Sequence, residues 1–154
     1  MQSFYKQYDD VVVLYNEKFG KPATALMKKI KEGGLITTDV EFDEKLEWTY
    51  YYLWHHEGRR ARMGASMMGP DYTQWHGMFE VGDRFYMEFV PEVREVIAEG
   101  RMHGKAAAAA EVEKLLNEIL SSDMHKWSLG KMSAEEKAAR KQAQDEFKKR
   151  YVGN

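Results

Sequence analysis

The sequence contains no cysteine, and that absence excludes several kinds of chemistry. Disulfides, thiolate metal sites, iron–sulfur clusters and cysteine nucleophiles all require the missing residue. So does the Cys-x-x-Cys-His attachment of c-type haem. Any covalently held haem must therefore be supplied by other polypeptide.

Long apolar runs are also missing, because the longest, 11–14, is far shorter than the ~20 residues of a membrane-spanning helix. We therefore expect no membrane segment. Residues 1–4 lack the basic start and apolar stretch of a secretory signal, so we expect any export signal to have been removed or never attached to this piece. The formal charge of -2 provides no net attraction to nucleic acid or anionic lipid, and neither is an expected partner.

Proline is scarce, with three residues in a chain of 154, and the stretches between glycines are rich in Ala, Glu, Lys, Leu and Met. These are strong helix formers, so the sequence predicts an all-α fold of antiparallel helices with long C-terminal helices. The chain is long enough to bury one core and too short to suggest two. We expect residues 1–154 to form a single helical domain.

Local signals predict where the helices begin and end. Gly20 is expected to end the first helix and Pro22 to begin the second. Asp43 is expected to cap the third, and Pro91 to kink or break the fourth. Ser133–Glu136 has the spacing of a capping box at the start of the last helix. The expected helices span residues 3–19, 22–33, 43–68, 73–99, 106–120 and 133–150.

The stretch Trp54–Gly77 is the part of the chain most suggestive of chemistry. Two histidines and three arginines crowd two turns of the third helix: His55, His56, Arg59, Arg60 and Arg62. Trp48, Tyr52, His55, Arg59 and Arg62 recur at helical spacing, which predicts a shared face. In one interpretation the arginines pair with carboxylates and the histidines lie between helices. In the other, one histidine ligates haem iron and the arginines bind haem propionates. Composition does not decide between them.

Other uses of these histidines are less well supported. Zinc is disfavoured because no His-x-x-x-His pair exists and His55 and His56 diverge by about 100° on a helix. A hydrolase built on Ser66 with His76 and Asp71 lacks the glycine pattern of a nucleophile elbow. The two remaining histidines are assigned no role and are expected at the surface: His103 and His125.

The segment Met68–Gly77 predicts a glycine-proline turn that leads into the fourth helix. It places Tyr72 at the entrance of that helix, where its phenol can project beyond the surface. Alternatively, Tyr72 is a turn anchor that is hydrogen-bonded to the backbone. Both interpretations are compatible with the pattern.

The run WHHEGRRARMGASMMGPDYTQWHG, followed by FYMEFVPEV, closely resembles the C-terminal part of octahaem hydroxylamine oxidoreductases, the family that also includes hydrazine dehydrogenases. The resemblance extends from about Tyr5 to about Ile97 and is strongest from Glu47 to Tyr86. It implies that residues 1–100 form a family-like core and that residues 101–154 form a helical tail.

This resemblance implies specific roles. Family members are multihaem cytochromes c that form trimers outside the cytoplasm and take electrons from hydroxylamine or hydrazine. A tyrosine of one subunit is joined covalently to the catalytic haem of its neighbour, and its motif position corresponds to Tyr72. The resemblance also implies a distal haem ligand at His55 or His56. His76 is a weaker candidate for haem contact. The implied propionate or interface partners are Arg59, Arg60 and Arg62.

The chain departs from the family in having no Cys-x-x-Cys-His motif, so it resembles the terminal module alone. Its expected partners are a haem-bearing chain or portion that holds haem c, and further copies in a trimer. The implied compartment is periplasmic or otherwise extracytoplasmic, and we expect no activity from the chain by itself. The alternative is a cofactor-free helical scaffold that assembles oligomers through its aromatic and methionine surface.

Overall fold

The computed structural model describes residues 2–37 and 39–151, which are mostly helical and contain no strand. This confirms the predicted all-α fold. The chain divides into two compact units, Met1–Ile119 and Leu120–Asn154. No helix in the described ranges is long and apolar enough to cross a membrane.

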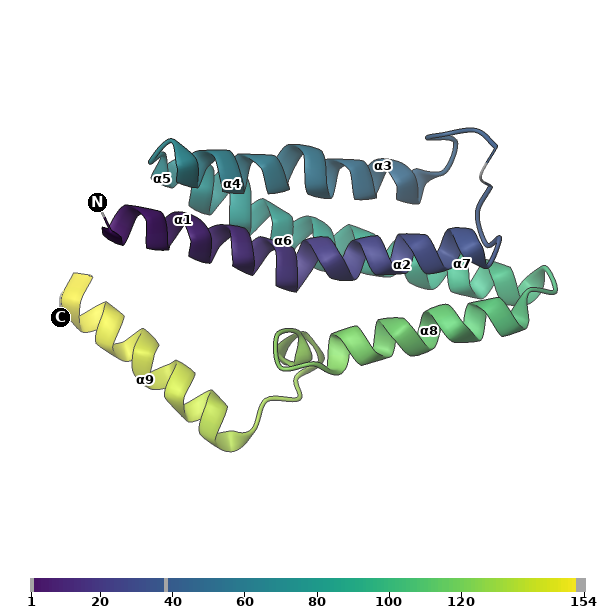
Figure 1. Cartoon of the computed structure of the whole chain (residues 1–154). Coiled ribbons are helices and arrows are strands. Elements are labelled where there is room, and N and C mark those ends of the chain that lie inside the picture. The colour runs from purple at the N-terminus through teal and green to yellow at the C-terminus, as the bar shows by residue number, and fades with distance from the viewer. Residues whose placement is uncertain (1, 38, 152–154) are drawn as a thin grey trace. The chain divides into compact units, whose positions relative to one another are not determined.

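The first unit contains three long helical stretches that run antiparallel, followed by α8 (Ala106–Ser121) (Figure 1). Each stretch alternates α-helix with π-helical turns, which are labelled η. The first consists of α1 (Gln2–Tyr15), η1 (Asn16–Gly20) and α2 (Lys21–Glu32). The second consists of α3 (Lys45–Tyr51), η2 (Tyr52–Glu57) and α4 (Gly58–Ser66). The third consists of α5 (Pro70–Thr73), η3 (Gln74–Phe79), α6 (Glu80–Arg84), η4 (Phe85–Phe89) and α7 (Val90–Met102).

Pro22 lies in the first turn of α2, as expected. The helix nevertheless continues through Gly20 and Pro91, so the expected end at Gly20 and a break at Pro91 are wrong. A proline ring crowds the carbonyl of the turn before it. A π turn ends two residues before each proline, and its hydrogen bonds join residues five apart: Lys21 N–H donates to Asn16 O, and Val90 N–H donates to Phe85 O. The wider π turn leaves room for the ring, so the helix is not broken.

Aromatic residues of these π turns build the core of the first unit. Phe19 packs edge-on against Phe85 with ring centroids 5.3 Å apart, and Phe85 stacks on Phe89 at 5.8 Å. Phe85 and Phe89 are fully buried. Burying such a ring stabilises the fold by roughly 1.5–3 kcal/mol, so these contacts join the first stretch to the third.

Two glycines let α4 approach the α5–η3 segment almost backbone to backbone. A Cβ on Gly77 would lie 2.5 Å from Ala61 Cα, and one on Gly64 would lie 2.7 Å from Thr73 N. Both distances are far inside van der Waals contact. The sequence therefore permits this packing only with glycine at both positions.

The beginning of α3 differs from the prediction, because Glu44 and not Asp43 occupies the N-cap position. Asp43 instead accepts a hydrogen bond from Thr37 Oγ1 at 2.7 Å, so its carboxylate is used within the preceding loop. The first residue of the helix, Lys45, forms an ion pair with the buried carboxylate of Glu92 at 3.0 Å. This pair links the start of α3 to α7.

The second unit contains a short 3-10 turn, η5 (Lys126–Leu129), and α9 (Ala134–Tyr151). The predicted capping box is confirmed: Ser133 N–H donates to Glu136 Oε2 at 2.7 Å, and Glu136 N–H donates to Ser133 Oγ at 3.1 Å. His125 was expected at the surface and is buried. Its N–H donates to Ser122 O, and the chain then turns into η5.

We predict that Gly77→Ala lowers the free energy of unfolding by about 1–3 kcal/mol, because the new Cβ overlaps the Ala61 backbone. The matched control is Gly82→Ala in α6, where a Cβ would meet nothing within 4 Å. That variant should gain about 0.5–1 kcal/mol from helix propensity. Urea unfolding measures both, and equal effects would contradict the proposed close contact.

We also predict a pH-dependent contribution from Lys45. The pKa of Lys45 is raised, chiefly by its hydrogen bond to Glu92. Its contribution to stability is therefore complete below about pH 10.4, the ordinary lysine value, and is lost as pH rises through the raised pKa. At pH 7 the Lys45→Met variant should have a lower free energy of unfolding than the wild type. Above pH 11 the two free energies should become similar.

Urea midpoints from pH 7 to pH 12 test this prediction. Lys28→Met serves as the control, because its amine lies 3.7 Å from an exposed carboxylate, Glu32, and should contribute little. A difference between wild type and Lys45→Met that stays constant across the titration would refute the assigned role.

Candidate functional site

The candidate histidines lie in π turns, which occur frequently at functional sites. His55 and His56 belong to η2, and His76 belongs to η3. A π turn adds a residue to the helical repeat and so rotates everything that follows. Arg62, which was expected to share a face with His55, lies over the ring of Tyr15 in α1.

An aromatic-histidine cluster extends along α3 and η2, with neighbouring rings in contact. His55 is stacked on Tyr51, with ring centroids 4.6 Å apart and planes at 15°. His56 meets Tyr52 at 5.2 Å, and the two imidazoles are 5.6 Å apart. Its members are Trp48, Tyr51, Tyr52, Trp54, His55 and His56. The cluster is a partly exposed aromatic surface that holds two imidazoles.

The surroundings of the His55 imidazole favour its neutral form. Desolvation lowers its pKa, and the positive charge of Arg59 and the neighbouring His56 lower it further. Its Nδ1 atom is buried and has no hydrogen-bond partner in the described part of the chain. Neutral imidazole is the form that coordinates metals, and here coordination would use Nε2.

The three candidate arginines have different surroundings. Arg60 pairs with Glu80 at 2.8 Å. Arg62 lies over the Tyr15 ring, 4.3 Å from its centroid, and donates to Trp54 O at 3.4 Å. Arg59 is exposed and has no hydrogen-bond or ion-pair partner among the described residues. Of the three, Arg59 is the one available to bind an external anion.

The turn between α4 and α5 presents Tyr72 to solvent. Thr73 is buried, and both its N–H and its hydroxyl donate to Gly69 O at 2.9 Å. Because Thr73 faces inward, Tyr72 faces outward and is 58% exposed. No hydrogen bond from the Tyr72 phenol to the backbone is present in the described part of the chain. Within that part, the phenol therefore does not anchor the turn.

His76 belongs to a charged network beside Tyr72. Its Nδ1 lies 3.0 Å from Glu80 Oε1, and its Nε2 lies 3.6 Å from Asp71 Oδ2. Glu80 also binds Arg60. Coordination of a metal by His76 would have to displace Asp71. The sequence pattern did not lead us to Glu80, although its i,i+4 spacing from His76 is the signal that could have identified it.

An apolar groove of about 400 Å³ lies between α4 and Tyr72. Met63 and Met67 form its apolar wall, and Arg59 and Arg60 stand beside them. A cationic group next to an apolar wall suits an anionic ligand with a large apolar body. The groove therefore has the chemistry that a haem edge and its propionate would require.

The described ranges contain no group of three or more His, Asp or Glu side chains placed to bind a metal ion. A haem iron needs fewer protein ligands than a free metal ion, because the macrocycle supplies four of them. A single histidine can then serve as the protein ligand. His55 fits that requirement by its neutral charge and its aromatic neighbours. Haem is compatible with the side chains present.

We predict that Met68→Gly stabilises the protein by about 0.5–1 kcal/mol, because Met68 has a φ of 56°, a left-handed conformation that disfavours side chains. Met67→Gly is the matched control, since Met67 has a φ of -94° and gains nothing from glycine. Thermal unfolding compares the two variants. Destabilisation by both would show that Met68 is not strained.

Comparison of the chain with protein-family models, with curated proteins and with solved structures gives no match. A functional proposal therefore depends on the geometry of this site and on the sequence resemblance, which extends from about Tyr5 to about Ile97 and is strongest from Glu47 to Tyr86.

Proposed function

We propose that this chain is the C-terminal helical module of a hydroxylamine oxidoreductase-like multihaem enzyme that oxidises hydroxylamine or hydrazine. The observation that carries the proposal is the exposed phenol of Tyr72, which stands beside an apolar groove with Arg59 at its edge. The haem c is held by another chain or portion, in a periplasmic or other extracytoplasmic compartment. The module is inactive alone.

In this proposal Tyr72 forms the covalent link to the catalytic haem of a neighbouring subunit. The methionines of the groove cover the apolar edge of that macrocycle, since thioethers adapt to irregular surfaces. Arg59 binds a propionate, for which a free guanidinium is well suited. Because the link crosses a subunit boundary, the assembly is a homo-oligomer, a trimer by resemblance.

His55 is the proposed axial ligand to a haem held by the haem-bearing portion. Its lowered pKa keeps the imidazole neutral, and the stacked ring of Tyr51 fixes the ring plane. The bound haems would accept electrons from the substrate nitrogen and pass them on. The protein side chains position and tune the haem and supply no electron themselves.

A cofactor-free scaffold is the second candidate, and one observation favours it. Large apolar side chains near the turn are strongly exposed: Met67 is 80% exposed, Trp75 63% and Phe79 60%. Exposed apolar surface of this kind marks an interface. The scaffold candidate differs from the first in requiring assembly without haem.

Coexpression with the haem-bearing chain that the proposal requires provides the test. We expect mass spectrometry of the digested complex to find a haem-linked peptide containing residue 72. Tyr72→Phe should abolish that adduct. Tyr5→Phe is the control, because Tyr5 is 59% exposed and therefore equally accessible. An adduct that survives Tyr72→Phe would refute the cross-link, and haem-free assembly would favour the scaffold.

A further inference from the structure

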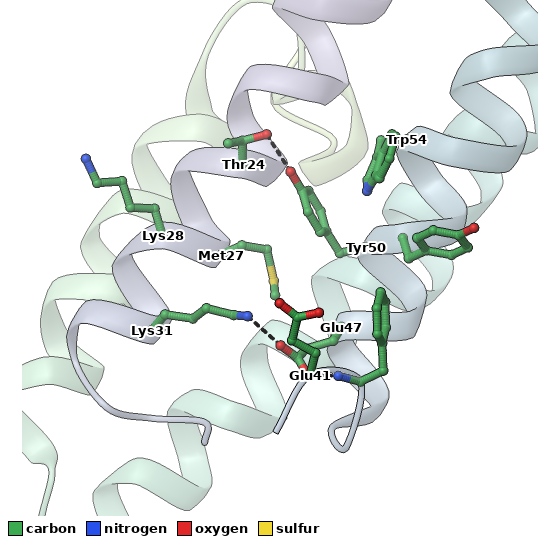
Figure 2. A pocket seen from close by; sticks show the side chains of 10 residues that line it. Thr24, Met27, Lys28, Lys31, Glu41, Glu47, Tyr50 and Trp54 are labelled. Atoms are coloured by element: carbon green, nitrogen blue, oxygen red, sulfur yellow. Dashed lines mark hydrogen bonds and ion pairs between the residues drawn. The ribbon is translucent and has the colours of Figure 1, made fainter. Parts of the chain in front are cut away.

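We propose that the pocket between α2 and the start of α3 binds a small organic cation with an aromatic body. The pocket has a volume of about 340 Å³, within the usual range for small-molecule sites (Figure 2). It lies outside the Tyr72 groove and shares no lining residue with it.

Four of the ten residues that line the pocket are aromatic. Phe42, Tyr51 and Trp54 line it, and they contact one another: Phe42 meets Tyr51 at 5.5 Å, and Tyr51 meets Trp54 at 5.7 Å. Met27 is buried and contributes a thioether to the lining. Aromatic faces carry negative quadrupole charge, so this lining attracts a cation.

The position of Phe42 suggests that the pocket is built for a ligand. Its φ is 62°, a left-handed conformation that costs a bulky residue of order 1–3 kcal/mol. Two contacts hold it there: its N–H donates to Glu47 Oε2, and the indole of Trp48 donates to its carbonyl, both at 2.8 Å. Strain maintained in this way concentrates at ligand sites.

The remaining charges select a cation over an anion. Lys31 is neutralised by the buried Glu47, to which it is hydrogen-bonded. The amine of Lys28 points away from the aromatic residues (Figure 2) and lies 3.7 Å from Glu32. Glu41 lines the pocket and has no hydrogen-bond or ion-pair partner in the described part of the chain. One carboxylate is therefore left uncompensated.

The hydrogen-bonding groups restrict the ligand further. The Thr24 hydroxyl donates to Gly20 O and also lies 2.8 Å from the Tyr50 hydroxyl, so both hydroxyl groups are already engaged (Figure 2). Glu47 is likewise occupied by Lys31 and by Phe42 N–H. A quaternary ammonium group, which needs no hydrogen bonds, is therefore a better match than a sugar or a carboxylic acid.

Titration of the full chain with phenyltrimethylammonium, followed by NMR shifts of the indole protons, tests the proposal. We expect saturable binding at least tenfold tighter than that of benzenesulfonate, which has a similar size and the opposite charge. Glu41→Gln should weaken binding threefold or more, and Trp54→Leu should weaken it further. Glu118→Gln, which removes an exposed carboxylate outside the pocket, should leave the affinity unchanged.

Three results would overturn the proposal: no saturable binding, preference for benzenesulfonate, or an affinity unaffected by Glu41→Gln in a variant whose far-UV circular dichroism matches the wild type. Preference for benzenesulfonate would indicate that the pocket binds anions through Lys28 and Lys31. Because the titration requires no haem-bearing chain, its result is independent of the Tyr72 cross-link.

Discussion

The arrangement of the candidate site depends on the close contact between α4 and the α5–η3 segment. Gly64 lies against the backbone of Thr73, and Gly77 lies against that of Ala61, with no side chain between. This contact buries Thr73 and so directs Tyr72 outward. The groove between α4 and Tyr72, and the charged network of His76, are consequences of the same packing.

Positive φ angles at non-glycine residues and π turns occur beside the candidate binding surfaces. Phe42 and Met68 both have positive φ, and they flank the second helical stretch at its two ends. Phe42 lines the aromatic pocket, and Met68 leads into the turn that presents Tyr72. The π turns add to this pattern, because two of them carry the candidate histidines. Strain and irregular helix accompany the candidate sites here.

The candidate arginines and histidines, which the sequence pattern does not tell apart, have different surroundings in the structure. Arg60 and Arg62 are engaged within the chain, whereas Arg59 remains available to an external anion. His76 lies between two carboxylates, while the pKa of His55 is lowered by desolvation and by neighbouring positive charge. Arg59 and His55 therefore differ from their neighbours in being unpaired within the described part of the chain and in having a lowered pKa, respectively.

The sequence alone determined the helical class, the capping box at Ser133 and the turn at Gly69–Pro70, because these depend on local propensity and short-range hydrogen bonds. Continuity through Pro22 and Pro91 was decided by π turns, whose aromatic residues pack in the core. Partner choice among the arginines, the burial of His125 and the strain at Phe42 were likewise decided by tertiary structure. Each depends on residues distant in the chain or on a backbone geometry that composition does not encode.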